Sequence, residues 1–187
     1  MTSKLASESM ATDAPLLEAL RSGWRQAQAI FREMFPGPVS LLEPHVGPAH
    51  QIECPPESIV VGMRFEGVAP GLAALALSHT SARALVVSLL GGEADGSGPD
   101  DAEVLSLLTD TALELANIVL NAVLAEAGRT LSETYRFEIP VLMTAEELAA
   151  ACDARTYLLR GEILCGGTLP ASAQVVVRRA SSGRAGR

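Results

Sequence analysis

Five polar residues in the second half of the chain recur at a helical spacing. They are Glu103, Asp110, Glu114, Asn117 and Asn121, at intervals of seven, four, three and four residues. At 3.6 residues per turn, these intervals confine the five side chains to roughly one sixth of a helix circumference. The residues between them are largely apolar, so a helix here must be buried over most of its surface. We call the five residues the polar stripe.

The stripe places a carboxylate and an amide one helical turn apart. Because an amide both donates and accepts hydrogen bonds, Asn117 can hold a water molecule, while Glu114 can bind a cation on a partner. No Gly-x-Ser-x-Gly elbow or similar nucleophile motif is present. The alternative is a stripe that is only the solvated side of a core helix, and it predicts that both residues tolerate Lys or Ala. Asn is a poor helix former, so its occurrence twice on this line favours a functional role.

The spacing of four of these residues and a later proline resembles a known motif. Asp110, Glu114, Asn117 and Pro140 fit the pattern of the CheC, CheX and FliY phosphatases, which is Asp or Ser, three residues, Glu, two residues, Asn, 22 residues and Pro. A match requires four residue types and one exact long gap, which makes it more specific than a short glycine pattern. The resemblance covers the chain from about Leu16 to Arg178.

This resemblance implies a chemistry that needs only a well-placed water molecule. The expected substrate is the aspartyl phosphate of a chemotaxis response regulator, an acyl phosphate that is already activated. The resemblance implies that Asn117 orients the attacking water and that Glu114 docks the regulator's active-site lysine. Asp110 and Asn121 would contact the partner, and Pro140 would be structural. No bound cofactor is implied, because the regulator supplies the Mg2+.

The first half carries a weaker copy of the same motif. Counting back from Pro44 over the same gap places Arg21 at the asparagine position, Glu18 at the glutamate position and Ala14 at the Asp or Ser position. An arginine cannot present an amide carbonyl to a water, and it carries a fixed positive charge. We therefore expect one competent site, in the second half, and a degenerate first site around Glu18 and Arg21.

Composition limits the partners and the compartment. The chain has 22 Asp and Glu against 14 Lys and Arg, a formal net charge of -8 that disfavours nucleic acid. Residues 1–13 are polar and show no signal-peptide pattern, and no membrane span is predicted, so the expected location is the cytoplasm. Cys54, Cys152 and Cys165 are widely spaced and odd in number, which indicates small buried side chains in a reducing compartment and no metal site.

Hydrophobic periodicity and turn residues predict alternating helices and strands. Helices are predicted over residues 15–35, 82–90 (capped by Thr80), 100–128 and 145–151 (capped by Thr144). Strands are predicted over residues 57–65, 71–78, 134–143, 156–165 and 171–178, and residues 39–46 are expected to be extended. The first two strands and the last two are predicted to form hairpins.

The order of these elements suggests a duplicated unit. We predict one domain over residues 14–179, with a first half at 14–92, a linker at 93–99 and a second half at 100–179, and disordered tails at 1–13 and 180–187. The predicted fold class is α+β, a CheC-like pseudo-duplicated domain with two long helices packed on a mostly antiparallel sheet. The alternative function is a non-catalytic chemotaxis module that binds a response regulator or the CheD receptor deamidase. The sequence leaves open whether the protein is a monomer or a homodimer.

Overall fold

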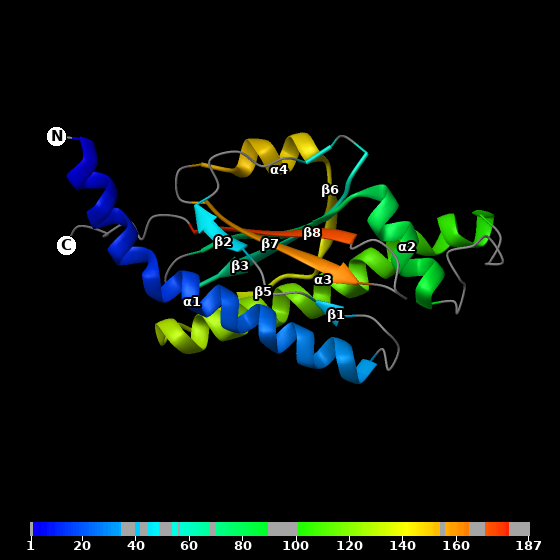
Figure 1. The fold of residues 1–187 in the computed structure, drawn as a ribbon, viewed down its shortest axis with the longest axis horizontal. Helices are drawn as coiled ribbons and strands as arrows, with labels where there is room; N and C mark the ends of the chain where they lie inside the picture. The colour runs from blue at the N-terminus through cyan, green and yellow to red at the C-terminus, as the bar shows by residue number, and fades with distance from the viewer. Residues whose placement is uncertain are drawn as a thin grey trace.

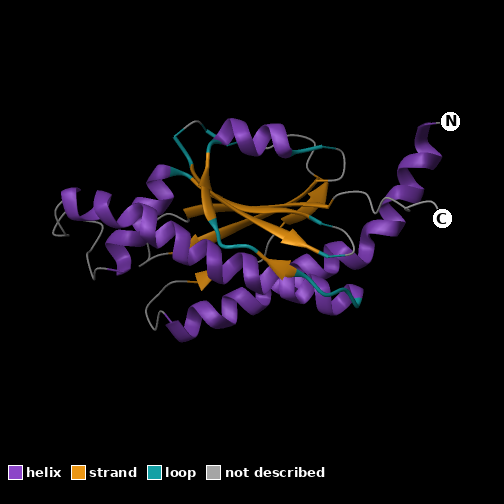
Figure 2. Ribbon diagram, turned by 180° about the vertical axis from the view of Figure 1, so that it is seen from behind, coloured by secondary structure: helices purple, strands orange, loops and turns teal. Residues whose placement is uncertain are grey.

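The chain folds into an antiparallel sheet with helices on both faces. A computed structural model describes residues 2–34, 40–41, 45–48, 54–55, 57–67, 70–89, 101–153, 156–164 and 171–179. Two long helices, α1 and α3, lie side by side under one face of the sheet, and the short helix α4 covers the other face (Figure 1). The same three layers are seen from behind in Figure 2. The predicted α+β class is confirmed.

The helices and strands alternate in the predicted order. The helices are α1 (Thr2–Met34), α2 (His79–Leu89), α3 (Asp101–Leu131) and α4 (Ala145–Ala151). The strands are β1 (Ser40–Leu41), β2 (His45–Pro48), β3 (Ile59–Glu66), β4 (Gly71–Leu77), β5 (Arg136–Phe137), β6 (Val141–Met143), β7 (Thr156–Leu164) and β8 (Ala171–Arg179). Both predicted hairpins form, because β3 pairs with β4 and β7 pairs with β8 in antiparallel register.

Three predicted boundaries differ from the structure. First, α1 begins at Thr2 and continues through Pro15, whereas the sequence predicts a tail over residues 1–13 and a helix start at Pro15. A proline removes one helical hydrogen bond, yet a helix that is already formed gains one bond for each residue added, so polar residues without periodicity can extend it. The predicted linker at 93–99 and the tail at 180–187 lie outside the described residues.

The second difference is the cap of α2. Ser78 caps this helix instead of Thr80: its hydroxyl accepts a hydrogen bond from the backbone N–H of Ser81 at 3.0 Å. The helix starts one turn earlier than predicted, which places Thr80 inside the first turn, where it cannot be the cap. The predicted cap of α4 is confirmed, with Thr144 and Glu147 forming a capping box.

The third difference is the strand predicted over residues 134–143, which is divided in two. β5 and β6 both pair with β3, and residues 138–140 separate them. Pro140 has no N–H to donate to the ladder, so a continuous strand through it is disfavoured. Because residues 138–140 are not part of a strand, they can lie close to α3.

The strands at the two edges of the sheet are exchanged between the halves. The order is β1-β7-β8-β4-β3-β5, with β2 also on β7 and β6 also on β3. Ser40 pairs with Leu164 at one edge. At the other edge, Arg136 pairs with Glu66. The two pairs correspond, because Arg136 follows Ser40 by 96 residues and Leu164 follows Glu66 by 98 residues. The short strands that follow α1 therefore join the hairpin of the second half, and those that follow α3 join the hairpin of the first.

The two central strands, β4 and β8, join the halves. Leu75 pairs with Val175, and this pair lies midway between the two matching edges. The register is thus that of two related units about a twofold axis through the middle of the sheet. The pairing of the strands has the symmetry that the predicted duplication requires.

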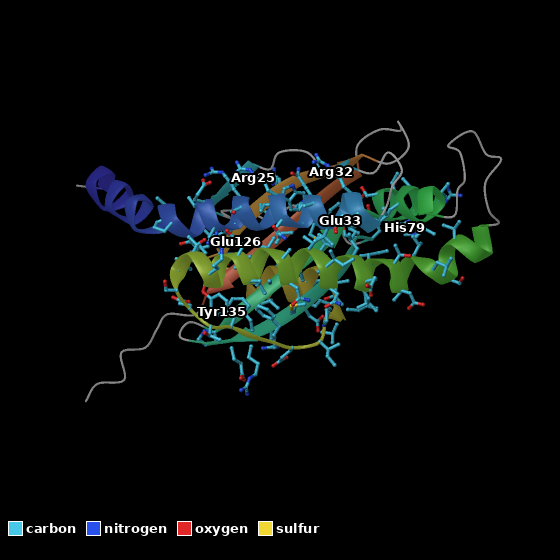
Figure 3. All side chains as sticks on the ribbon, turned by 90° about the horizontal axis from the view of Figure 1, so that it is seen from below. Arg25, Arg32, Glu33, His79, Glu126 and Tyr135 are labelled. Atoms are coloured by element: carbon cyan, nitrogen blue, oxygen red, sulfur yellow. The ribbon has the colours of Figure 1, made fainter. Side chains whose placement is uncertain are left out.

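The two long helices approach each other closely at Gly23. A Cβ atom on Gly23 would lie 2.5 Å from the Cα of Val123, so only glycine allows this contact. Beside it, the Ser22 hydroxyl donates a hydrogen bond of 2.8 Å to the Glu126 carboxylate, which also accepts from Arg129 at 2.6 and 2.9 Å. Figure 3 shows Glu126 at the seam between the helices. These hydrogen bonds lower the pKa of Glu126 to about 2, with Arg129 contributing most.

Trp24 joins α1 to the sheet of the second half. Its side chain is fully buried. A Cβ atom on Gly161 of β7 would overlap the Trp24 ring. The glycine therefore leaves room for the indole, and the first helix is seated on a strand from the other half of the chain.

α3 forms much of the core. By length and composition alone, its stretch Ser106–Leu131 could cross a membrane, and among the described helices no other could. Half of the 18-residue segment that meets this criterion is buried inside the protein, and a core helix has the same apolar composition. A second, smaller core lies under α4 around Leu148, with Cys54 and Cys152 half-buried beside it. Cys165 lies outside the described residues.

Candidate functional site

The polar stripe faces solvent along α3. Asp110, Glu114 and Asn117 are exposed and Asn121 is half-buried, while Leu115 and Leu120 on the other side of the helix are buried. The side chain of Glu103 lies outside the described residues. The helical periodicity of the sequence therefore identified the exposed side of α3 correctly.

A shallow depression of about 530 Å³ lies between the stripe and the break separating β5 from β6. From α3 it is lined by Asp110, Leu113, Glu114, Asn117 and Asn121, and from the strand break by Phe137, Glu138, Ile139 and Pro140. The structure thus brings together every residue that the sequence assigned to the second-half site. It also adds Glu138 and Ile139, whose positions depend on the break in the strand.

The end of α3 turns the chain back toward this depression. Ser132 takes a left-handed backbone conformation with φ 54°, and the N–H of Glu133 donates to the Gly128 carbonyl at 2.8 Å, which ends the helix. Beyond β5, the N–H of Glu138 donates to the carbonyl of Arg64 at 2.9 Å. β3 therefore anchors the segment on both sides of Pro140 and holds it beside the stripe.

The two asparagines of the stripe are hydrogen-bonded to each other. The Nδ2 of Asn121 donates to the Oδ1 of Asn117 at 2.8 Å and to the backbone carbonyl of Asn117 at 2.7 Å. The sequence predicts a partner contact for Asn121, whereas its amide nitrogen is directed at Asn117. The i, i+4 spacing that permits this bond is visible in the sequence.

The charge of the depression is negative. Asp110, Glu114 and Glu138 line it together with Asn117, so the surface favours a cationic group on a binding partner. In the described part of the chain, no group of three His, Cys, Asp or Glu side chains is placed to share a metal ion. The arrangement can bind a cation on a partner and hold a water beside it.

Comparisons with known proteins agree at the level of structure. No protein-family profile matches the sequence, and no curated protein matches it. FliY from Thermotoga maritima superposes with a TM-score of 0.62 at 13% identity, over 86% of each chain. CheX from Borrelia burgdorferi, solved in a complex with CheY, BeF3 and Mg2+, superposes with a TM-score of 0.57 at 15% identity, over 90% of this chain and 97% of that chain. This chain has the CheC/CheX/FliY fold.

The CheC-like fold also occurs in FliM. The FliM middle domain from H. pylori superposes with a TM-score of 0.52 at 15% identity, over 88% of this chain and 91% of that chain. A chain of an H. pylori FliG-FliM complex superposes with a TM-score of 0.59 at 13% identity. Because one fold supports different functions, the residues at the site must carry the argument about chemistry.

The first half of this CheC-like fold presents an ion-paired surface at the position related to the stripe. The carboxylate of Glu18 lies 3.5 Å from the guanidinium of Arg21 and 3.7 Å from that of Arg25. Arg25 and Arg32 lie on the side of α1 that faces away from α3 (Figure 3). Glu18 is thus already paired with cations of its own chain, and this face is basic where the α3 face is acidic. Pro44, the last residue of the first motif, lies outside the described residues.

Exposed apolar side chains flank the depression of the CheC-like fold. Ile139 is 84% exposed, and Val141 and Leu142 are 58% and 52% exposed. Residue type alone marked them as strand residues, which are commonly buried on at least one side. Pro140 between them was the signal for an irregular edge. The predicted role of that proline is structural, yet the predicted strand runs continuously through it.

Proposed function

We propose that this chain hydrolyses the aspartyl phosphate of a chemotaxis response regulator with a CheY-type receiver domain. In this proposal, Asn117 orients the attacking water and Glu114 docks the regulator's lysine. The observation that carries it is that Glu114 and Asn117, one helical turn apart, face the same exposed depression as Pro140. The similarity in fold to a CheX solved with CheY supports the choice of partner. The proposed location is the cytoplasm.

The chemistry matches a site without a nucleophile. The oxygen of water attacks the phosphorus, the bond between phosphorus and the aspartyl oxygen breaks, and the products are aspartate and inorganic phosphate. Asn117 can accept a hydrogen bond from that water through Oδ1 and donate one through Nδ2, which fixes the direction of attack. The Mg2+ that neutralises phosphoryl charge would belong to the regulator.

The surroundings of the site favour a protein substrate. A lysine on the partner would meet the carboxylates of Glu114, Asp110 and Glu138, and charge-assisted contacts of this kind fix the register of two proteins. The exposed Ile139 and Leu142 offer apolar surface that a protein partner can cover. A small molecule would be poorly enclosed by so shallow a surface.

The test is the decay of a phosphorylated receiver domain from the same organism, measured with Mg2+ and increasing amounts of this protein. Asn117→Ala should reduce the acceleration by about 100-fold, because water is no longer held in line, while binding to the receiver persists. Gln26→Ala is the matched control, since Gln26 is also an exposed amide on a long helix. It should behave as wild type.

The alternative outcomes are distinct. Full activity in Asn117→Ala would overturn the proposed mechanism. If the wild-type protein binds the receiver without changing its decay, the protein is a binding module and the catalytic proposal falls.

A further inference from the structure

The side-chain amide nitrogen of Asn121 donates two hydrogen bonds, and both go to Asn117. The Nδ2 group donates to Oδ1 and to the backbone carbonyl of Asn117, at 2.8 and 2.7 Å. We propose that Asn121 is a positioning residue that sets the orientation of the Asn117 amide before the regulator binds. This inference rests on the proposed phosphatase function and deepens it.

The bond removes a choice that an exposed asparagine otherwise has. The terminal torsion of an asparagine is broad and roughly twofold, so a free amide presents either its oxygen or its nitrogen in a given direction. Here the oxygen of Asn117 is held toward the following turn of α3 by Asn121. The Nδ2 group of Asn117 and the second lone pair of its Oδ1 remain available to water at the depression. One donor and one acceptor are thus presented together.

Orientation of this kind should affect the rate more than the affinity. In the proposed reaction, the water oxygen forms the new bond to phosphorus and the bond to the aspartyl oxygen breaks, and Asn117 contributes only by holding that water. If the amide is fixed in advance, it holds the water in the direction of attack that the transition state requires, and the contact with that water strengthens in the transition state. Asn121→Ala should therefore lower kcat by about 3- to 10-fold with little change in KM for the phosphorylated regulator.

The experiment is a double-mutant cycle on the full-length protein. The wild type, Asn117→Ala, Asn121→Ala and the double variant are compared for kcat and KM with the phosphorylated receiver. Because Asn121 acts through Asn117, its removal should cause no further loss once Asn117 is alanine. Ala is a better helix former than Asn, so the single variant should keep α3 folded. Asn121→Asp, whose side chain has the same shape but no hydrogen-bond donor, should show the same fall in kcat as Asn121→Ala.

Each deviation from this pattern has a separate meaning. A raised KM with unchanged kcat, or a loss that adds to that of Asn117→Ala, would overturn the positioning role, since Asn121 would then contact the partner itself. Wild-type kinetics in Asn121→Ala would also overturn it. In all these cases an inactive Asn117→Ala leaves the proposed phosphatase function standing, whereas a fully active Asn117→Ala removes both.

Discussion

An amide in the place of a nucleophile limits what this site can do. Asn117 can orient water, but it cannot form a covalent intermediate or act as a general base at neutral pH. The substrate must therefore already carry a good leaving group, and an acyl phosphate does. The proposed chemistry follows from the weakness of the side chain as much as from its position.

Glu126 should make the stability of the protein depend on pH. Its pKa is lowered from 4.5 to about 2 in the folded state by its bonds to Arg129 and Ser22. A lowered pKa means stabilisation that is present above the unfolded value of 4.5 and is lost as pH falls toward 2. Glu126→Gln should cost about 1 kcal/mol of unfolding free energy at pH 7 and progressively less as the pH falls below 4.5, measured by urea unfolding at pH 7 and pH 3.

The control for this prediction is Glu33→Gln, which changes an exposed carboxylate on α1 (Figure 3). It should have little effect at either pH. An equal cost of Glu126→Gln at pH 7 and pH 3 would contradict the proposed linkage, because the loss would then come from packing.

At the scale of residues, the sequence predicts the polar members of the depression that belong to α3, but not Leu113. Periodicity places Glu114 and Asn117 on one exposed line whatever the tertiary structure. Glu138 and Ile139 could not be found in the same way, since their position follows from hydrogen bonds to β3 on both sides of Pro140. The bond from Asn121 to Asn117 is local, but residue type and spacing do not tell whether an asparagine faces its neighbour or a partner.

At the scale of elements, the break between β5 and β6 gives the site its second wall. Pro140 interrupts the ladder, and the residues around it expose apolar surface that a regular strand would bury. Such a surface is costly to leave in water and is typical of an interaction site. The same interruption explains why the predicted single strand was wrong.

Ile139→Ser should weaken binding of the receiver and leave chemistry intact. Ile139 is the most exposed large hydrophobic residue described and it lines the depression. Covering its side chain should contribute about 1–2 kcal/mol to association, so the Kd measured by titration calorimetry should rise by about 5- to 30-fold. The phosphorylated receiver should still decay at the wild-type rate when the Ile139→Ser protein is present at a saturating concentration.

The matched control is Thr130→Ser, a change on the exposed surface of α3 near its C-terminus, away from the depression. Its Kd should be that of the wild type. An unchanged Kd for Ile139→Ser would show that the partner does not cover this edge.

At the scale of the whole molecule, the halves depend on each other. Each half supplies the edge strands of the other half's hairpin, and β4 pairs with β8 across the centre. The sequence suggested the duplication through the order of its elements. It could not reveal the exchange of edge strands, because antiparallel pairing can join strands that are close or distant in the chain. The hydrophobic pattern of a strand does not indicate which other strand it pairs with.

This exchange predicts the behaviour of fragments. Residues 1–92 and 93–187, expressed separately, should each lack cooperative thermal unfolding, because each leaves a long sheet edge and an apolar helix face uncovered. Expressed together, they should co-purify as a one-to-one complex with the circular dichroism spectrum of the intact chain. Cooperative unfolding of either fragment alone as a monomer would contradict the interdependence of the halves.

The seating of Trp24 against Gly161 bears on how the two halves can diverge. The buried side of α1 is constrained by the strand beneath it, whereas its outer side, with Glu18, Arg21 and Arg25, is free to change without loss of the fold. A duplicated protein of this kind can give up the chemistry of one copy and keep its architecture. Natural variation should therefore be broad at the outer positions of α1 and narrow at Trp24 and Gly161, so that one half can keep the proposed catalytic residues while the outer surface of the other half changes.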